Sequence, residues 1–228
     1  MCGRYSLTTA PEAMRRLFAA DGPLPNWPPR YNIAPTQTAP VVRRRSGPQG
    51  NEIALLRWGL VPSWSKGPDP ALSMINARAE TVATKPAYRA AFRQRRCLVP
   101  ADGFFEWQTL PGAGGKPAKQ PYHFRMKDGA PFAFAGLWEH WQGGDGTRIE
   151  SFTIIVTDAN ELVRPIHDRM PVILDPSSYA QWLEAKTPAE LLQALLRPFP
   201  ARAMTAIKVS THVNNPKNDD AACIEPAA

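Results

Sequence analysis

The chain is built from short runs in which apolar and polar residues alternate. Turn-forming residues, such as the Gly-Pro-Gln-Gly at 47–50, separate these runs. Alternation with a period of two is typical of half-buried strands. We therefore expect strands at 38–45, 52–58, 96–100, 103–108, 121–126, 131–136, 149–157 and 203–209.

Helical spacing occurs in only a few short segments. Thr9 and Glu12 stand as Thr-x-x-Glu ahead of an apolar run, which predicts a capping box and an amphipathic helix. A second helix is expected to open near Pro86, and a third is expected to be capped at Thr187 ahead of a leucine stripe. Scattered helices among dominant strands predict one α+β domain over residues 1–228, built on a bent, barrel-like, mainly antiparallel sheet.

Composition narrows the class of protein. The 228 residues include 25 prolines, and hydrophobic residues make up 43% of the chain. This is typical of a globular protein with short elements and many turns, and we expect loops at 22–29, 62–70 and 111–119. No apolar stretch approaches the roughly 20 residues of a membrane helix, and the first residues do not resemble a signal peptide. We expect a cytoplasmic protein that does not contact membranes.

Three cysteines are too few and too irregularly spaced for a disulfide scaffold. Cys97 lies in an apolar run and is expected in the core, whereas Cys223 lies in a Pro- and Ala-rich tail and looks incidental. The cysteines, histidines and acidic residues show no spacing typical of a zinc site. We expect no metal and no cofactor.

Charge is distributed unevenly along the chain. The net charge is +7, but residues 1–105 carry 15 basic and 6 acidic residues, while residues 106–228 carry 12 and 14. A basic half and a slightly acidic half indicate a face that attracts an anion, and nucleic acid is a large anion available to a cytoplasmic protein. A solvated, arginine-rich surface is the alternative.

Cys2 has chemistry that is available only at the start of a chain. Removal of Met1 would leave an α-amine and a thiol on adjacent carbons. The amine, with a reference pKa of about 7.7–8.0, can attack an aldehyde and form a Schiff base. The thiol can then close onto the imine carbon and form a five-membered thiazolidine ring. Taken alone, Cys2 could also be an incidental start residue.

Three internal segments carry further candidate groups. Glu106 lies in an aromatic run, where desolvation would raise its pKa and suit it to proton transfer, unless it faces solvent. Asn76, Arg78 and Glu80 alternate with small residues, so they share one face if the segment is extended, which is also compatible with a plain surface strand. His167 could act as a general acid or base, although a lone histidine is more often structural.

Seven motifs occur in a fixed order along the chain. They are Met-Cys-Gly-Arg-Tyr at 1–5, Tyr-Asn-Ile-Ala-Pro-Thr at 31–36, Trp-Gly-Leu-Val-Pro-Ser-Trp at 58–64, Asn-Ala-Arg-Ala-Glu-Thr at 76–81, Arg-Cys-Leu-Val-Pro-Ala-Asp-Gly-Phe-Phe-Glu-Trp at 96–107, Ala-Gly-Leu-Trp at 135–138 and Ile-His-Asp-Arg-Met-Pro-Val-Ile-Leu at 166–174. Together they resemble the SOS response-associated peptidase family, also called the SRAP domain. The resemblance covers nearly the whole chain.

The resemblance implies a function in the DNA damage response. A protein of this family is expected to bind single-stranded DNA, at stalled forks or junctions, and to crosslink covalently to abasic sites through Cys2, which shields the lesion. The same resemblance makes Asn76, Glu106 and His167 the other catalytic residues. It also implies lyase-like activity and an autoproteolytic removal of Met1, the hydrolase step behind the name peptidase. We expect a monomer that associates with the nucleoid when it is bound to DNA.

Five further residues match positions that the family uses for DNA. By resemblance, Arg4 and Arg78 fall on arginines that hold DNA phosphates. Asn32, Pro35 and Trp64 fall in segments that line the DNA groove. From the sequence alone, Trp64 could stack on a base or could pack as a loop aromatic on the core.

Two other functions remain open at this stage. Cys2 and His167 could form the dyad of a cysteine protease that cleaves other proteins. Alternatively, the chain could be a non-catalytic module that reads modified bases in DNA, with reversible and salt-sensitive binding. Only covalent capture of an abasic site requires a free α-amine on Cys2.

Overall fold

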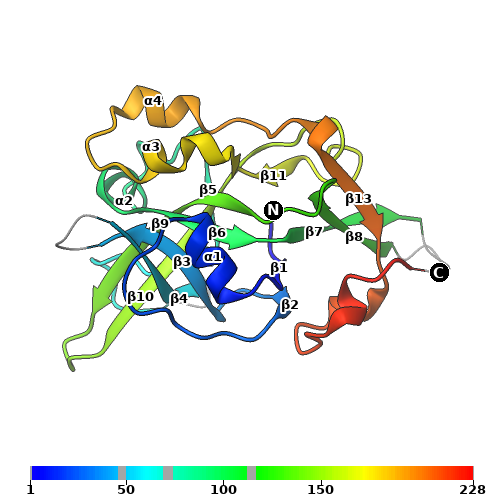
Figure 1. Ribbon diagram of the computed structural model, residues 1–228, viewed down its shortest axis with the longest axis horizontal. Helices are drawn as coiled ribbons and strands as arrows, with labels where there is room; N and C mark the ends of the chain where they lie inside the picture. Colours follow the sequence, from blue (N-terminus) through cyan, green and yellow to red (C-terminus); the bar gives the residue numbers. More distant parts are fainter. Residues whose placement is uncertain (1, 46–49, 69–73, 112–116, 228) are drawn as a thin grey trace.

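The computed structural model describes residues 2–45, 50–68, 74–111 and 117–227, and its regular elements are mainly strands (Figure 1). The strands are β1 (Tyr5–Leu7), β2 (Arg30–Ile33), β3 (Thr38–Arg44), β4 (Asn51–Trp58), β5 (Asn76–Arg78), β6 (Arg96–Ala101), β7 (Gly103–Leu110), β8 (Ala118–Met126), β9 (Phe132–Gln142), β10 (Arg148–Asp158), β11 (Arg169–Pro171), β12 (Ile173–Leu174) and β13 (Met204–Lys208). The helices are α1 (Pro11–Leu17), α2 (Arg89–Gln94), α3 (Tyr179–Leu183) and α4 (Ala189–Ala194). All of the predicted strand segments are confirmed.

The larger sheet closes into a barrel. Its strands follow the order β11-β10-β4-β3-β6-β9-β12, and β9 also pairs with β10. Strands β10, β4, β3, β6 and β9 therefore form a ring, which leaves these strands without a free edge. β10 runs parallel to β4 and β5, while the other pairs among the described residues are antiparallel. The expected α+β class with a barrel-like, mainly antiparallel sheet is confirmed.

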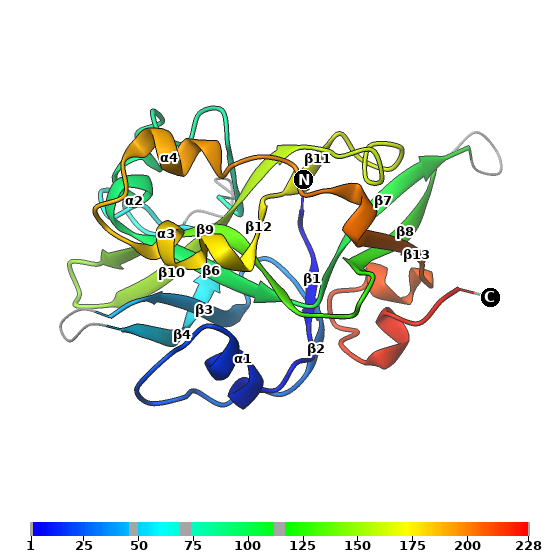
Figure 2. The same ribbon diagram turned by 45° about the horizontal axis from the view of Figure 1, so that its top comes forward.

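The smaller sheet carries the start of the chain. Its strands follow the order β13-β8-β7-β1-β2 and all of its pairs are antiparallel. In β1, Tyr5 is paired with Phe104 on one side and with Ile33 on the other. The β7–β8 hairpin places Glu106 opposite Tyr122. Because β1 lies between two other strands, the chain begins in the middle of the molecule (Figures 1 and 2).

Aromatic side chains join the two sheets. The Tyr5 ring contacts the rings of Trp58 and Phe134 edge-on, with centroid separations of 5.2 and 5.9 Å. All three side chains are fully buried. Burial of one such ring contributes roughly 2–3 kcal/mol to stability. This cluster fixes β1 against the barrel, and it therefore fixes Cys2, which lies three residues before Tyr5.

Helices α1, α2 and α4 form near the predicted positions and α3 was not predicted, and two predicted caps are wrong. Helix α1 has Ala10 at its N-cap and no side-chain cap, because the Thr9 hydroxyl instead donates to Asp102 Oδ1 at 2.7 Å. Helix α4 also begins without a side-chain cap, since the Thr187 hydroxyl donates to the carbonyl of Gln181 at 2.8 Å. In both cases a tertiary or loop acceptor competes with the helix terminus for the hydroxyl.

The predicted loops agree with the structure where it describes them. Residues 22–29 and 62–68 contain neither helix nor strand, and β8 begins within the 111–119 loop, at Ala118. Most of the turn at 47–50 and the middle of the 111–119 loop lie outside the described residues.

Helices α2, α3 and α4 gather at one end of the molecule (Figures 1 and 2). Across the described ranges, no helix has the length and apolar character needed to cross a membrane.

The C-terminal segment, residues 210–227, packs against β2 instead of ending free. It contains two short 3-10 turns, Thr211–Asn214 and Ala221–Cys223. Val213 and Cys223 are fully buried in a small apolar cluster with Phe105. The view that Cys223 is incidental is therefore wrong, because its side chain helps to close the tail onto the smaller sheet.

Candidate functional site

Cys2 lies inside the protein at the start of the smaller sheet. Its side chain is fully buried, and its thiol lies a long 3.9 Å from the carbonyl of Arg4. Burial raises the pKa of the Cys2 thiol far above its usual range, and the negative charge of Glu106 raises it further. The thiol is therefore protonated at neutral pH, and it interacts electrostatically with Glu106.

Glu106 is a buried carboxyl group on β7, with 3% of its surface exposed. Both of its preceding neighbours, Phe104 and Phe105, are fully buried, so β7 has no solvent face at this point. Burial raises the pKa of Glu106 to about 7, and the charge of Asp168 also raises it. The predicted desolvation is confirmed and the solvent-facing alternative is wrong. Near pH 7, Glu106 can both donate and accept a proton.

His167 lies half-buried on the loop before β11. The backbone N–H of Arg169 donates to its Nδ1 at 2.9 Å, while the carboxylate of Asp168 lies 3.0 Å from the same atom. Desolvation lowers the pKa of His167, although Asp168 opposes part of the shift. A neutral ring that accepts at Nδ1 carries its proton on Nε2. The loop reaches β7, since Gln108 Nε2 donates to the carbonyl of Pro165 at 3.3 Å.

Asn76 offers a buried acceptor whose hydrogen-bonding capacity is not used. It is the first residue of β5 and is paired with Ile154 of β10. Its Nδ2 is 3.5 Å from the carbonyl of Ile154, and its buried Oδ1 has no hydrogen-bond partner within the described part of the chain. A buried acceptor without a partner is costly and is often completed by a ligand.

The segment after Asn76 departs from the predicted extended face. The strand ends at Arg78, which is exposed, and Glu80 lies in the following turn. Glu80 forms an ion pair with Arg169, two residues beyond His167. This pair ties the Asn76 segment to the His167 loop.

Arg4 and Asn32 hold the C-terminal segment. The guanidinium of Arg4 donates to Asn32 Oδ1 and to the carbonyl of Val213, both at 2.9 Å. Asn32 is fully buried, and its Nδ2 donates to the carbonyls of Val213 and Asn218 at 3.1 and 2.7 Å. These donors and acceptors are thus used within the protein. Asn32 does not face solvent, and it supports Arg4 and the C-terminal segment from inside the protein.

A pocket opens beside the start of the chain. Its volume is about 370 Å³, and it is lined by Gly3, Arg4, Trp107, Lys119 and Asn214. Trp107 Nε1 donates to Asn214 Oδ1 at 2.6 Å, so the C-terminal segment forms one wall. Two basic side chains and an indole around a small hollow suit an anionic ligand with a flat or apolar part. Sequence reasoning missed Lys119, because its role depends on the β7–β8 pairing that brings it back beside Trp107.

Trp64 and Pro35 lie on loops outside the core. The Trp64 side chain is 67% exposed, so the alternative in which it packs on the core is wrong. Its loop is anchored where Trp141 Nε1 donates to the carbonyl of Ser65 at 2.9 Å. Pro35 is half-buried in the turn after β2, next to Thr36, whose φ is 72°. An exposed indole on an anchored loop is suited to stacking on a base.

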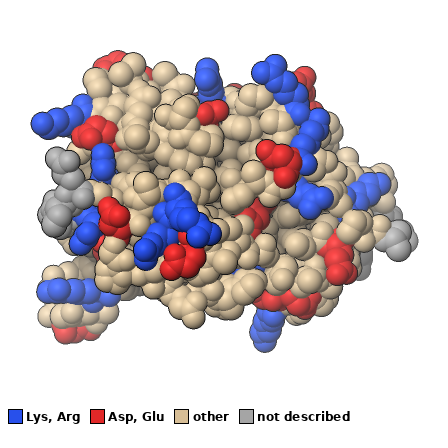
Figure 3. Space-filling view, in the orientation of Figure 1, with Lys and Arg blue, Asp and Glu red and all other residues tan. Residues whose placement is uncertain are grey.

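Ion pairs across the fold balance part of the charge asymmetry along the sequence. Arginines of the first half pair with acids of the second half, as in Arg30–Asp219, Arg43–Glu150, Arg44–Glu184 and Arg95–Glu139. Figure 3 shows basic residues in separate groups with acidic residues among them, and no continuous basic surface on that face. The pocket lined by Arg4 and Lys119 is one place where positive charge faces a hollow.

Comparison with known proteins agrees with the sequence motifs. The model of the SOS response associated peptidase (SRAP) family matches residues 1–216. The chain is 41% identical to the abasic site processing protein YoaM of Bacillus subtilis, over 99% of this chain and 98% of that protein. It is 31% identical to the abasic site processing protein HMCES of Xenopus tropicalis, over 98% of this chain and 78% of that protein.

Solved structures share the fold. A protein from Bacteroides thetaiotaomicron superimposes with a TM-score of 0.87 at 26% identity, and the match covers the full length of both chains. A protein from Bordetella bronchiseptica superimposes with a TM-score of 0.72 at 31% identity, over 92% of this chain and all of that one. These structures share the overall fold along nearly the whole chain.

Proposed function

The chain belongs to the SOS response associated peptidase family, and from this premise we propose that it processes abasic sites in DNA by covalent capture through Cys2. Relatives that match it over nearly its whole length are named abasic site processing proteins. The observation that carries the covalent step is the coupling of a fully buried Cys2 thiol to a buried Glu106 whose pKa is raised to about 7.

The reaction needs both nucleophiles of an N-terminal cysteine. Once Met1 has been removed, by an autocatalytic step in our proposal, the Cys2 α-amine attacks the aldehyde carbon of the ring-opened abasic sugar. The resulting carbinolamine loses water and gives a Schiff base. The sulfur then attacks the imine carbon, while the thiol proton ends on the nitrogen. The products are a thiazolidine and one water molecule, and no oxidant or metal is consumed.

Glu106 and His167 supply the proton transfers. Glu106, with a pKa of about 7, can protonate the departing hydroxyl and can then, as a carboxylate, take the thiol proton as the ring closes. His167 is neutral because desolvation lowers its pKa, and its Nε2–H can donate to the sugar oxygen during ring opening. The buried Oδ1 of Asn76 would accept from a sugar hydroxyl or from the Cys2 amine.

The DNA contacts are proposed to be few and local. Arg78 and Lys119 would hold phosphates, and Trp64 would stack on a base of a single strand. Arg4, with Asn32 beneath it, would position the pocket wall and add positive charge. Pro35 would shape the loop beside the groove. A monomer bound at a stalled fork or junction would in this way shield the lesion during the damage response.

The raised pKa of Cys2 argues against the protease alternative. Cysteine proteases use a thiolate whose pKa is lowered by a nearby imidazolium. Here burial raises the pKa of the Cys2 thiol, and desolvation keeps His167 neutral. A protonated thiol is a poor first nucleophile, whereas a thiol that attacks an imine already formed on the same residue needs only local proton transfer.

A crosslinking assay tests the proposal. Purified protein is mixed with end-labelled single-stranded DNA that carries one abasic site, and the products are separated under denaturing conditions. The wild-type chain and a Cys97→Ser control, in which the other core thiol is altered, should give a shifted band that Cys2→Ala lacks. Intact mass should show that Met1 is absent. A band that persists in Cys2→Ala, or capture by protein that retains Met1, would falsify the assignment. Cleavage of unrelated peptides without capture would instead favour a protease.

A further inference from the structure

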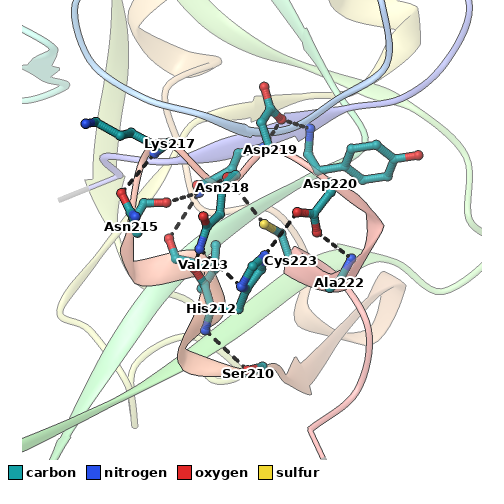
Figure 4. Close-up of polar contacts among 12 residues, drawn as sticks. Ser210, His212, Val213, Asn215, Lys217, Asn218, Asp219, Asp220, Ala222 and Cys223 are labelled. Carbon is teal, nitrogen blue, oxygen red and sulfur yellow. Dashed lines mark hydrogen bonds and ion pairs between the residues drawn. The ribbon is translucent and has the colours of Figure 1, made fainter.

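The C-terminal segment brings together three side chains that are distant from Cys2 in sequence and have no part in the proposed reaction. His212, Asp220 and Cys223 each offer one ligand atom, and the three atoms lie within 4.8 Å of one another. His212 Nε2 is 3.0 Å from Asp220 Oδ2. Figure 4 shows the imidazole, the carboxylate and the sulfur converging between the two 3-10 turns.

The donor set has the chemistry of a zinc site. Thiolate sulfur, imidazole nitrogen and carboxylate oxygen are the three ligand types that zinc takes in proteins, at bond lengths of about 2.0–2.3 Å. In a tetrahedral site, ligand atoms are separated by about 3.3–3.7 Å, so the present set needs a closure of only about 1 Å along its longest side. Magnesium and calcium prefer all-oxygen sites, and sulfur disfavours both ions.

The surroundings also fit a metal ligand. Cys223 is fully buried and donates to the carbonyl of Asn218 at 3.4 Å, while His212 and Asp220 keep part of their surface in solvent, which leaves a path for an ion. The amide of Asn218 lies 3.1 Å from His212 Nδ1. The same Nδ2 donates to the carbonyl of His212 at 2.8 Å. Zinc at Nε2 requires the imidazole proton on Nδ1, so the Asn218 side chain would turn away from the ring when the metal binds.

We propose that His212, Asp220 and Cys223 bind one zinc ion, with water in the fourth position. On binding, the thiol of Cys223 loses its proton to solvent, and Asp220 exchanges its contact with His212 for the metal. The ion would join the turn at 211–214 to the turn at 221–223. Sequence spacing does not indicate this site, because the ligands are separated by eight and three residues and meet only after the tail folds onto β2.

The proposed site would stabilise the pocket wall without taking part in the chemistry. Val213 and Asn214, which follow His212, accept hydrogen bonds from Arg4, and Asn214 also accepts from Trp107. Zinc that binds only the folded state increases the free energy of unfolding, and the increase grows with the logarithm of the ratio of zinc concentration to dissociation constant. The zinc site does not depend on crosslinking, so the two proposals can fail separately.

Zinc and cobalt titrations of the full-length protein test the site. After equilibrium dialysis against zinc chloride and removal of excess metal, elemental analysis should find one zinc per chain. The Cys2 thiol and its α-amine could together bind a metal. A Cys2→Ser variant, which removes that thiol, should retain the one zinc per chain. His212→Ala and Cys223→Ser should bind at least tenfold more weakly. The control His140→Ala removes an exposed histidine that lies 3.6 Å from a single carboxylate and should bind as the wild type does.

Cobalt gives a second readout that does not depend on the stability of the variants. A thiolate-to-cobalt charge-transfer band should appear in the wild type and in Cys2→Ser, and Asp220→Asn, at an exposed position, should weaken cobalt binding without loss of fold. Three results would overturn the proposal: absence of stoichiometric zinc in the wild type, equal binding by His212→Ala, or a charge-transfer band that disappears with Cys2→Ser.

Discussion

Burial, more than any single charged partner, sets the acid–base properties of the side chains around Cys2. Desolvation is the largest cause of the raised pKa values of Cys2 and Glu106 and of the lowered pKa of His167. All three shifts favour the uncharged form. The site therefore keeps neutral groups that exchange protons, which suits an addition to a carbonyl in which no permanent charge must be stabilised.

Glu106→Gln should slow crosslinking without loss of DNA binding. Glutamine keeps the size of the side chain but cannot transfer a proton, and general acid–base catalysis contributes roughly 100-fold or more. The wild-type rate should show an inflection near pH 7, where Glu106 changes charge, and the variant should lack it. Single-turnover crosslinking rates between pH 5 and 9 measure this effect. An unchanged profile in the variant would remove Glu106 from the reaction.

The same substitution should slow the reaction but should also remove a loss of stability that the wild type shows as pH rises. The pKa of Glu106 is raised from 4.5 to about 7 in the folded state. Between these values the folded protein holds a proton that the unfolded chain has released, so stability falls as pH rises through the window, by about 3 kcal/mol in total. We compare the free energy of unfolding of Glu106→Gln with that of the wild type. The variant minus wild-type difference should therefore be larger above pH 7 than at pH 4.

Urea denaturation at several pH values tests this prediction. Burial lowers the pKa of His123 to about 4, so this histidine adds a pH dependence of opposite sign. His123 is present in both proteins, and its contribution cancels when the two free energies of unfolding are subtracted. A constant difference between pH 4 and pH 8 would mean that Glu106 is not desolvated.

At the scale of elements, one side chain fixes the strand that carries Cys2. Asp102, between β6 and β7, accepts hydrogen bonds from the backbone N–H groups and hydroxyls of Thr8 and Thr9, directly after β1. Hydrogen bonds to a charged acceptor are worth more than neutral ones, typically about 1.5–3 kcal/mol each. Asp102 therefore anchors the end of β1 that lies opposite Cys2.

Asp102→Ala should destabilise the protein by about 2–3 kcal/mol, because several donors lose one shared acceptor. Asp128→Ala is a matched control, since Asp128 is exposed and accepts a hydrogen bond from the backbone N–H of Ala130, two residues away. That control should change stability by less than about 0.5 kcal/mol. Thermal or urea unfolding measures both variants. Equal effects would show that β1 is held by its sheet pairing and aromatic packing alone.

The longer strands could be predicted from the sequence, but the short strands β1 and β2 and the supporting contacts could not. Alternation in segments such as 149–157 is a local signal, so β10 was found with nearly correct bounds. The capping box at Thr9 failed because Asp102, 93 residues away, takes its hydroxyl. The packed tail was missed for the same reason, since Asn32 and Arg4 hold it through contacts across about 180 or more residues. Rules based on neighbouring residues do not include a hydrogen-bond acceptor that comes close only in the folded protein.

The candidate site shows the same limit. Motif resemblance named Cys2, Asn76, Glu106 and His167, and the raised pKa of Glu106 followed from its aromatic neighbours. Lys119 falls in the predicted 111–119 loop and was not a candidate, because only the pairing of Thr109 with Lys119 places it beside the pocket. Buried Asn32 looked like a groove residue, since sequence does not reveal which polar side chains face inward.

At the scale of the whole molecule, pairing of opposite charges reduces the positive charge available to DNA. The arginine-rich first half is compensated by acids of the second half, as in Arg43 with Glu150 and Arg95 with Glu139. The net charge of +7 already includes these acids, but a paired arginine must give up its acidic partner before it can bind a phosphate. Affinity for undamaged DNA should be modest, and the covalent bond would provide the lasting attachment.

Salt dependence measures how many cations meet phosphates. Each phosphate neutralised on a single strand contributes a slope of about −0.7 to a plot of log affinity against log salt. If Arg78 and Lys119 are the phosphate contacts, binding of undamaged single-stranded DNA, followed by fluorescence anisotropy, should give a slope of about −1.4. Arg78→Ala and Lys119→Ala should each reduce its magnitude by about 0.7, whereas Arg44→Ala should leave it unchanged, because Arg44 is paired with Glu184. A slope steeper than about −5 would mean that DNA displaces the acidic partners, and the interface would then extend well beyond the pocket.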